Sequence, residues 1–303
     1  MGQHKDWYNE MKHQIEPFIP MESGDKGRRR YDMIHEIVPI QEKGSEKYAR
    51  MCTYFWEYSE DIPIGDRPVV LICPGGAYYA TSDREAEAIA LKIMDMGFHA
   101  AVLRYSVAPA KYPTALTEVA RAVSLLREHA KEWHINPEKI AVMGFSAGGH
   151  LAASFGVFWN EPFLADAIGC ETEKLRPNAL LLCYPVITSD PKYWHEGSFR
   201  NLLGEEDDGD MLDRMSLEKQ VGEQVPKTFI WHTFEDKSVP AENSLLWVQA
   251  LMRHKIPVEF HLYEKGIHGL SLATELTDNQ RRETVCPESQ SWITLAQTWL
   301  KSI

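Results

Sequence analysis

The chain is organised around the stretch Lys139-Ile140-Ala141-Val142-Met143-Gly144-Phe145-Ser146-Ala147-Gly148-Gly149-His150. An apolar run typical of a strand ends here in the pattern G-x-S-x-G, and a run of small residues typical of a helix follows at once. Glycines beside Ser146 would let strand and helix approach closely and leave the serine hydroxyl exposed on a tight turn. A plain glycine–serine turn would fit the five residues alone, but the strand and helix around them favour a nucleophile. We therefore predict Ser146 as a nucleophile.

Apolar runs alternate with helix-like patterns on both sides of this stretch. Predicted strands cover residues 33–40, 48–57, 69–73, 100–105, 140–143, 179–183, 228–232 and 258–263. Predicted helices cover residues 115–133, 147–157, 241–254 and 289–300, and one more runs from a capping box, Ser82 to Glu85, to a stop at Gly97. Two leading strands followed by this alternation predict an α/β fold with one mostly parallel, doubly wound sheet of eight strands.

Two segments do not follow this rhythm. Residues 1–30 are polar and become basic towards their end, which predicts an N-terminal arm or a short helix. Residues 188–224 are rich in charged and aromatic residues without a clean period, and a structureless loop of that length is unusual. We expect residues 188–224 to form a cap-like insertion over the top of the sheet, within a single domain of residues 1–303.

The composition argues against several classes of function. The chain has 303 residues, of which 44% are hydrophobic and 25% charged, as in a globular protein. Its formal net charge of −12 argues against a nucleic-acid-binding or an anionic-membrane-binding surface. No apolar run approaches the roughly 18 residues that a membrane-spanning helix needs. The first residues lack the apolar segment of a signal peptide.

The cysteines are few and widely spaced. Their number is odd, and no two of them form a C-x-x-C pair: Cys52, Cys73, Cys170, Cys183 and Cys286. This pattern disfavours a disulfide framework and a zinc site, so we expect Cys73 and Cys183 to be core thiols. Together with the missing signal peptide, it predicts a cytoplasmic protein.

A serine hydroxyl needs a base to take its proton, and that base needs an orienting carboxylate. After a nucleophile on such a turn, the acid and then the histidine follow later in the chain. His268 fits best as the base, because it follows the last predicted strand and glycines flank it. The histidines that fit less well lie in strand runs, on or at the end of helices, or in the insertion: His150, His195, His232, His254 and His261.

The acid should follow the predicted strand 228–232, where Glu235 and Asp236 both stand. Adjacent side chains on a tight loop cannot both face the histidine. We prefer Asp236, because Pro240 can fix the loop after it and start the next helix.

Backbone N–H donors are expected where negative charge would develop on the substrate oxygen. Ala147 N–H is one candidate, because a helix begins at that residue. The loop after the predicted strand 69–73 contains Gly75, which permits the turn, and then Gly76 and Ala77. We expect the N–H groups of Gly76, Ala77 and Ala147 to form an oxyanion hole.

Tyr78, Tyr79 and Trp194 stand in loops near these residues, and we expect them to form an aromatic wall for a substrate. Packing without substrate contact is the alternative for all three. The acidic run 205–210 resembles a calcium loop, but with Gly209 at the sixth position its ligand register fails, so we read it as a solvated loop. We expect no metal and no organic cofactor.

Five motifs together resemble a known superfamily: Cys73-Pro74-Gly75-Gly76-Ala77-Tyr78, Tyr112-Pro113, Gly144-Phe145-Ser146-Ala147-Gly148-Gly149-His150-Leu151-Ala152, Asp236-x-x-Val239-Pro240 and Gly266-Ile267-His268-Gly269. They look like the α/β-hydrolase superfamily, over about residues 65–300, and most like its acetylxylan-esterase-like and feruloyl-esterase-like branch. The related hormone-sensitive-lipase group carries His-Gly-Gly-Gly, where this chain has Pro74 for the histidine and Ala77 for the last glycine. The backbone donors survive both changes.

The resemblance implies a serine esterase that works through an acyl-enzyme and removes acetyl groups from sugars or xylo-oligosaccharides. Its partner would then be a small-molecule ester substrate, an acylated oligosaccharide, and a homo-oligomer stays open. An amide hydrolase of the same mechanism, an arylformamidase or a peptidase, is an alternative that the fold and triad do not exclude. A non-catalytic binding protein on this fold is another, although it would not need Ser146, Asp236 and His268 together.

Overall fold

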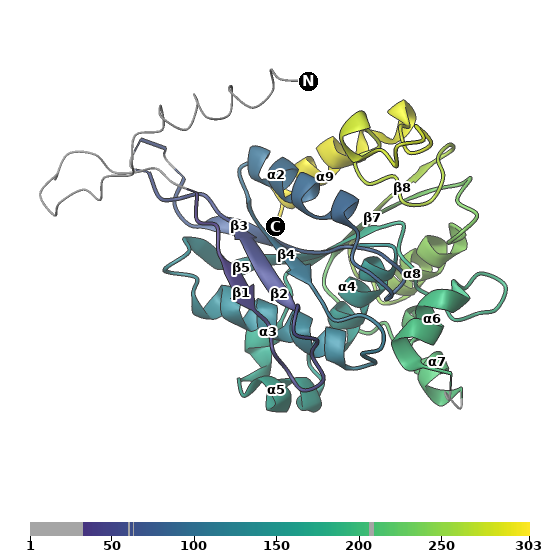
Figure 1. Cartoon of the computed structure of the whole chain (residues 1–303), viewed down its shortest axis with the longest axis horizontal. Helices are drawn as coiled ribbons and strands as arrows, with labels where there is room; N and C mark the ends of the chain where they lie inside the picture. The colour runs from purple at the N-terminus through teal and green to yellow at the C-terminus, as the bar shows by residue number, and fades with distance from the viewer. Residues whose placement is uncertain (1–32, 60, 63, 206–208) are drawn as a thin grey trace, which may run out of the picture. The chain divides into compact units, whose positions relative to one another are not determined.

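Eight strands form one sheet in the part of the chain that the computed structural model describes, residues 33–303 without 60, 63 and 206–208 (Figure 1). In chain order they are β1 (Ile37–Pro39), β2 (Arg50–Tyr54), β3 (Arg67–Cys73), β4 (His99–Arg104), β5 (Ile135–Phe145), β6 (Ala179–Cys183), β7 (Thr228–Thr233) and β8 (Val258–Tyr263). Their order in the sheet is β1-β2-β4-β3-β5-β6-β7-β8. Only the β1–β2 and β2–β4 pairs are antiparallel among these strands. The predicted eight-stranded, mostly parallel α/β sheet is confirmed, whereas the predicted N-terminal arm, residues 1–30, lies outside the described residues.

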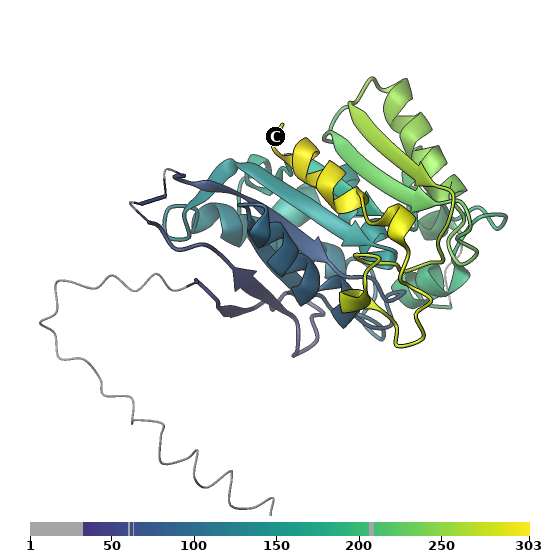
Figure 2. The same cartoon turned by 90° about the horizontal axis from the view of Figure 1, so that it is seen from above.

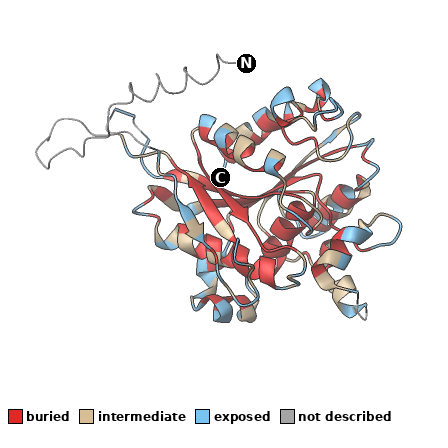
Figure 3. Cartoon of the chain, in the orientation of Figure 1, coloured by how far each residue is buried: buried red, intermediate tan, exposed pale blue. Residues whose placement is uncertain are grey.

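The sheet separates two hydrophobic cores, because successive side chains of a strand point to opposite faces. In β3, Val69 and Leu71 belong to one core and Val70 and Ile72 to the other. A strand buried on both faces reads as a continuous apolar run, which is why β3 to β7 were visible in the sequence. Figure 3 shows the central strands buried and the outer faces of the helices exposed.

Helices cover both faces of the sheet (Figure 2). The first core also contains side chains of α3 (Thr114–Glu128), α4 (Ala147–Phe158), α5 (Pro162–Ile168) and α8 (Glu242–Arg253). The second contains side chains of α2 (Glu87–Asp95) and α9 (Trp292–Leu300). Residues 33–303 thus form one compact unit of three layers, with the sheet between two layers of helices.

The start of α2 differs from the prediction. Ser82 makes no capping hydrogen bond with its side chain; a short 3-10 turn, Asp83–Glu85, comes first, and α2 begins at Glu87. Glu85 is buried instead, where its carboxylate accepts hydrogen bonds from Gly75 N–H at 2.8 Å and from the Tyr184 hydroxyl at 2.7 Å. The Ser-x-x-Glu pattern was therefore misread, because Glu85 serves a tertiary contact and not the helix end.

The segment 188–224, between β6 and β7, contains in its described part the α-helices α6 (Glu196–Leu203) and α7 (Asp210–Arg214) and a 3-10 helix, Leu217–Lys219. Cys73 and Cys183 are fully buried, as the sequence predicted. None of the helices in the described part of the chain has the length and apolar character that crossing a bilayer requires.

Candidate active site

The turn after β5 holds Ser146 in a strained backbone conformation, with φ +53° and ψ −120°. Its N–H donates to Cys183 O at the end of β6, at 3.0 Å, and its carbonyl accepts from Val186 N–H at 3.1 Å. The neighbouring strand connection therefore fixes both sides of the turn, and the side chain is aimed by the backbone.

Glycines make this turn possible, as the sequence suggested. A Cβ on Gly144 would lie 2.0 Å from Gly148 O, and one on Gly148 would lie 2.1 Å from Cys73 O. No other residue type fits at these distances, so β5, α4 and the end of β3 approach each other only because both positions are glycine.

Ser146, His268 and Asp236 form one hydrogen-bonded chain. Ser146 Oγ lies 2.7 Å from His268 Nε2, and His268 Nδ1 lies 2.6 Å from Asp236 Oδ2. A carboxylate only accepts, so Nδ1 carries the imidazole proton and Nε2 is left to accept from the serine hydroxyl. The structure thus brings together the three residues that the sequence predicted, in an arrangement that can remove the serine proton.

Asp236 is buried, with 4% of its surface exposed. Its Oδ1 accepts from Ser238 N–H and Val239 N–H, both at 2.9 Å. Burial raises the pKa of Asp236, but hydrogen bonds from His232 and His268 outweigh it and hold that pKa well below its usual range. The alternative acid, Glu235, is exposed and accepts from Gly266 N–H at 3.2 Å instead.

His232 is a neighbour of the triad that sequence reasoning missed. Its buried Nε2 lies 2.8 Å from Val239 O and 3.3 Å from Asp236 Oδ2, and its Nδ1 lies 2.7 Å from Ser244 Oγ. Both groups facing Nε2 are acceptors, so Nε2 carries a proton and presents it to the carboxylate side of Asp236. The available signal was its place at the end of a strand, four residues before the acid.

Tyr184 packs against the imidazole of His268. Its ring and the imidazole form a T-shaped pair with centroids 5.2 Å apart, and its hydroxyl accepts from Ser271 N–H at 2.9 Å while donating to Glu85. Burial raises the pKa of Tyr184, so the hydroxyl stays protonated and remains a donor. No motif in the sequence pointed to this residue.

The loop after β3, residues 75–78, lies directly beside the nucleophile. A Cβ on Gly75 would be 3.0 Å from Ser146 Cβ. The next three residues have positive φ angles: +134° at Gly76, +54° at Ala77 and +54° at Tyr78. We call residues 75–78 the oxyanion loop, because it contains Gly76 and Ala77, whose N–H groups the sequence predicted as oxyanion donors.

Hydrogen bonds within the loop orient its peptide groups. Gly75 O accepts from Ser82 N–H at 2.8 Å, and Gly76 O accepts from the N–H groups of residues 79 and 80 at 2.9 and 3.0 Å. In a trans peptide the N–H points opposite the preceding carbonyl, so these bonds turn the N–H groups of Gly76 and Ala77 away from the loop interior. Within the described residues, neither they nor Ala147 N–H has a recorded acceptor. All three N–H groups are therefore without a hydrogen-bond partner in this part of the chain.

The predicted aromatic wall needs a correction. Tyr78 is only 2% exposed, and its hydroxyl lies 3.0 Å from Nδ1 of the buried His150. A side chain packed beneath the loop cannot contact a substrate, and the sequence could not tell which way Tyr78 points. Tyr79, by contrast, is 74% exposed.

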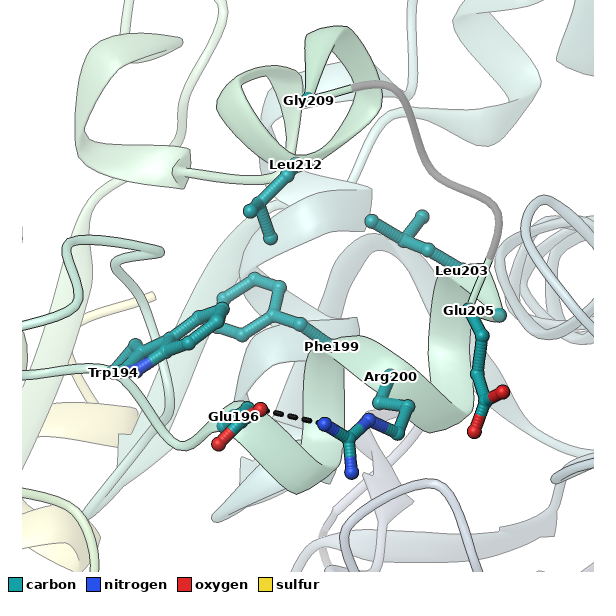
Figure 4. Close-up of a pocket in the computed structure, with 9 residues that line it drawn as sticks. Trp194, Glu196, Phe199, Arg200, Leu203, Glu205, Gly209 and Leu212 are labelled. Atoms are coloured by element: carbon teal, nitrogen blue, oxygen red, sulfur yellow. Dashed lines mark hydrogen bonds and ion pairs between the residues drawn. The ribbon is translucent and has the colours of Figure 1, made fainter.

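Trp194 is half-buried and stacks on Phe199, with ring centroids 6.2 Å apart and 27° between the planes. It lines a pocket of about 480 Å³ between α6 and α7, together with Leu203 and the ion-paired Glu196 and Arg200 (Figure 4). The pocket combines aromatic and charged groups, and its volume suits a small ligand. Elsewhere in the described residues, no group of three His, Cys, Asp or Glu side chains is arranged to hold a metal ion.

Comparison with known proteins gives consistent relatives. The BD-FAE family model matches residues 58–251. The chain is 39% identical over 220 residues to an endo-1,4-beta-xylanase B of Butyrivibrio fibrisolvens, covering 69% of this chain and 33% of that protein. It is 28% identical over 206 residues to an acetylxylan esterase of Xylanibacter ruminicola, covering 66% of this chain and 40% of that protein. The chain therefore spans a third to two fifths of the length of these two relatives.

Among solved structures, an acetyl ester-xyloside bifunctional hydrolase from Caldicellulosiruptor lactoaceticus superimposes with a TM-score of 0.75 at 32% identity. The match covers 88% of this chain and 96% of that one, so here the two chains correspond over nearly their whole length.

Proposed function

The chain belongs to the BD-FAE family of α/β-hydrolase esterases, and on this premise we propose that it hydrolyses acetyl esters of sugars or xylo-oligosaccharides through an acyl-enzyme on Ser146. The observation that carries the proposal is the continuous hydrogen-bonded chain from Ser146 Oγ through His268 to Asp236. It ends beside a loop in which the N–H groups of Gly76 and Ala77 have no protein acceptor in the described range. A nucleophile, its base and a site for negative charge thus lie within one small region.

In the proposed reaction, Ser146 Oγ attacks the ester carbonyl carbon while His268 Nε2 takes the hydroxyl proton. The carbonyl oxygen becomes an oxyanion, which the N–H groups of Gly76, Ala77 and Ala147 stabilise. The C–O bond to the alcohol then breaks, and the alcohol leaves with the proton from His268. A water molecule repeats the sequence on the acyl-enzyme and releases acetate. Asp236 stays ionised throughout, because its pKa is held well below its usual range.

The substrate class rests on the relatives, of which one is named an acetylxylan esterase and another an acetyl ester-xyloside hydrolase. Trp194 and Tyr79 are the exposed or half-exposed aromatic residues that we assign to the sugar half of the substrate. Flat aromatic faces provide apolar contact at low entropic cost, which suits the C–H faces of a sugar ring.

The test is acetate release from acetylated xylo-oligosaccharides, measured for the natural chain and for Ser146→Ala. Ser302→Ala, an exposed serine at the end of the chain, is the matched control. We expect release by the natural chain and by Ser302→Ala, and its loss in Ser146→Ala. Release that persists in Ser146→Ala would refute the serine mechanism.

N-Formylkynurenine, assayed in parallel, separates the amide hydrolase from the esterase. Cleavage of this formamide alone would keep the triad and refute the substrate. A fluorophosphonate probe tests the remaining alternative, a binding protein, because it labels only an activated serine. A folded protein in which the probe does not label Ser146 would favour that alternative.

A further inference from the structure

The segment 188–224 contacts the oxyanion loop through α6. The side-chain amide of Asn201 donates from Nδ2 to Ala77 O at 2.8 Å. The next residue, Leu202, accepts at its carbonyl from Tyr112 N–H, also at 2.8 Å. Ala77 O can only accept, so the NH₂ group of Asn201 must face it. One residue of α6 thus reaches the loop with a side chain while its neighbour anchors the helix through the backbone.

Three successive carbonyls of the loop are tied down by different partners. Gly76 O accepts from the main-chain N–H groups of residues 79 and 80, and Tyr78 O accepts from Ala108 N–H at 2.8 Å. Ala77 O, between them, accepts from the Asn201 side chain. Among the contacts recorded for these three carbonyls, Asn201 is therefore the one that a side-chain substitution can remove.

The carbonyl that Asn201 binds lies between two non-glycine residues with positive φ. Ala77 and Tyr78 both have φ +54°, which costs free energy for residues with a Cβ and persists only where the surroundings fix it. If Ala77 relaxed to a negative φ, the Gly76–Ala77 peptide, which carries Ala77 N–H, would rotate relative to the Ala77–Tyr78 peptide, whose carbonyl Asn201 binds. That N–H is one of the proposed oxyanion donors.

A second connection joins the same two parts of the chain. His150 on α4 lies 3.0 Å from the Tyr78 hydroxyl through Nδ1 and 3.0 Å from Met215 O through Nε2. Met215 belongs to the segment 188–224 and is fully buried. The segment is therefore connected to the oxyanion loop at two points, directly at Ala77 and through His150 at Tyr78.

We propose that Asn201 is a positioning residue of the oxyanion hole, through which the segment 188–224 holds Ala77 N–H in place. The inference rests on the proposed acyl transfer at Ser146. It gives this segment a role in stabilising the transition state, separate from any contact that Trp194 makes with the substrate.

The test compares Asn201→Ala and Asn201→Asp with the natural chain, using a small ester such as p-nitrophenyl acetate. Loss of a whole oxyanion donor typically costs 10²–10³ in kcat, and a donor that is only misplaced should cost less. We expect kcat to fall roughly 10-fold in Asn201→Ala and further in Asn201→Asp, whose carboxylate would face the Ala77 carbonyl. KM should change less than about 2-fold, because the loss concerns the transition state.

Inhibition by a boronic acid that forms a tetrahedral adduct with Ser146 is the second measurement. A purely structural role of Asn201 would not change this inhibition. The inhibition constant should rise by about the same factor as kcat falls, because the adduct uses the same N–H groups. Lys219→Gln is the matched control, since it breaks a surface ion pair with Asp213 in the same segment without touching the loop. We expect it to leave kcat and boronic-acid affinity unchanged.

Three outcomes would overturn the inference: unchanged kcat in both Asn201 variants, a change confined to KM, or a fall in kcat without weaker boronic-acid binding. Far-UV circular dichroism and a thermal midpoint identify a variant that fails to fold, and Asn201→Ser then replaces it. Activity that survives in Ser146→Ala would instead refute the proposed function, so the two failures are distinguishable.

Discussion

The carboxylate of Asp236 and the oxyanion loop face the same serine, yet they are held by different kinds of contact. Asp236 is buried and bound by the backbone of its own turn and by two histidines. The oxyanion loop consists of backbone groups in left-handed conformations, held by side chains from α4 and α6. The acid is thus fixed locally, whereas the loop depends on distant parts of the chain. We call Asp236 with its turn and two histidines the acid half of the site, and residues 75–78 with the side chains that hold them the oxyanion half. The acid half should tolerate substitutions elsewhere in the chain, and the oxyanion half should not.

The largest effect is expected from Asp236→Asn, which breaks the acid half at its centre. The amide cannot hold His268 with Nδ1 protonated as the carboxylate does, so we expect kcat to fall on the order of 10⁴-fold, as in other triads. Steady-state kinetics with p-nitrophenyl acetate measures it. Glu235→Gln is the control, and a comparable loss there would show that the wrong carboxylate was assigned.

Gly76→Ala breaks the oxyanion half through its backbone. A Cβ at this position would lie 2.1 Å from Ala80 O, and φ is +134°. The loop must therefore change shape, and we expect a 10²–10³-fold loss of kcat. Gly65→Ala, where a Cβ would meet nothing within 4 Å, should keep normal kinetics. Normal kinetics in Gly76→Ala would mean that the loop does not supply the donors.

Lowering the pH should weaken the contacts that hold the oxyanion half before those that hold the acid half. Burial lowers the pKa of His150 to about 4, so between pH 6.5 and 4 the unfolded state binds a proton that the folded state does not. The free energy of unfolding should therefore fall by about 3 kcal/mol for this residue as pH drops through that range. Asp236 has a lowered pKa, so its contribution is kept until the pH falls below about 4.

Urea unfolding at pH 7.5, 5.5 and 4.5 measures this dependence. The buried His99, whose pKa burial also lowers to about 4, contributes a similar slope in the natural chain. His150→Gln should remove its own share and flatten the curve, leaving the share of His99. An identical slope in His150→Gln and the natural chain would contradict the assignment.

The smallest effect is expected from Trp194→Ala, which touches neither half. We expect KM for acetylated xylo-oligosaccharides to rise roughly 5-fold, in line with the loss of one aromatic contact, while kcat stays nearly constant. Trp194→Phe should retain most of the affinity. A fall in kcat with unchanged KM would instead place Trp194 with the residues that support the oxyanion loop.

The same contrast explains what could be predicted from the sequence. Strands β6 and β8 were predicted at their observed bounds. β6 is buried along its whole length and reads as a continuous apolar run, whereas the edge strand β8 alternates apolar and polar residues. Ser146 directly follows β5, and Asp236 and His268 lie on the loops that follow β7 and β8, so their order along the chain indicated that they would lie near one another. The acid half was therefore readable from local signals.

The support of the oxyanion half was not readable in this way. Tyr78 was predicted to be part of an aromatic wall for the substrate and is buried, and Glu85 was predicted to cap a helix and binds Gly75. Asn201 lies in a segment without a clean pattern, more than a hundred residues from the carbonyl that it binds. Contacts between distant side chains leave no period and no motif in a single sequence.

One carboxylate links the two halves and has an evolutionary consequence. Glu85 accepts from Gly75 N–H in the oxyanion loop through Oε2 and from the Tyr184 hydroxyl, beneath His268, through Oε1. Losing either partner would leave a buried polar group without its hydrogen bond, which costs more than replacing both together. Substitutions at positions 85 and 184 should therefore be inherited in pairs across the family, and aligned relatives should keep both residues or neither.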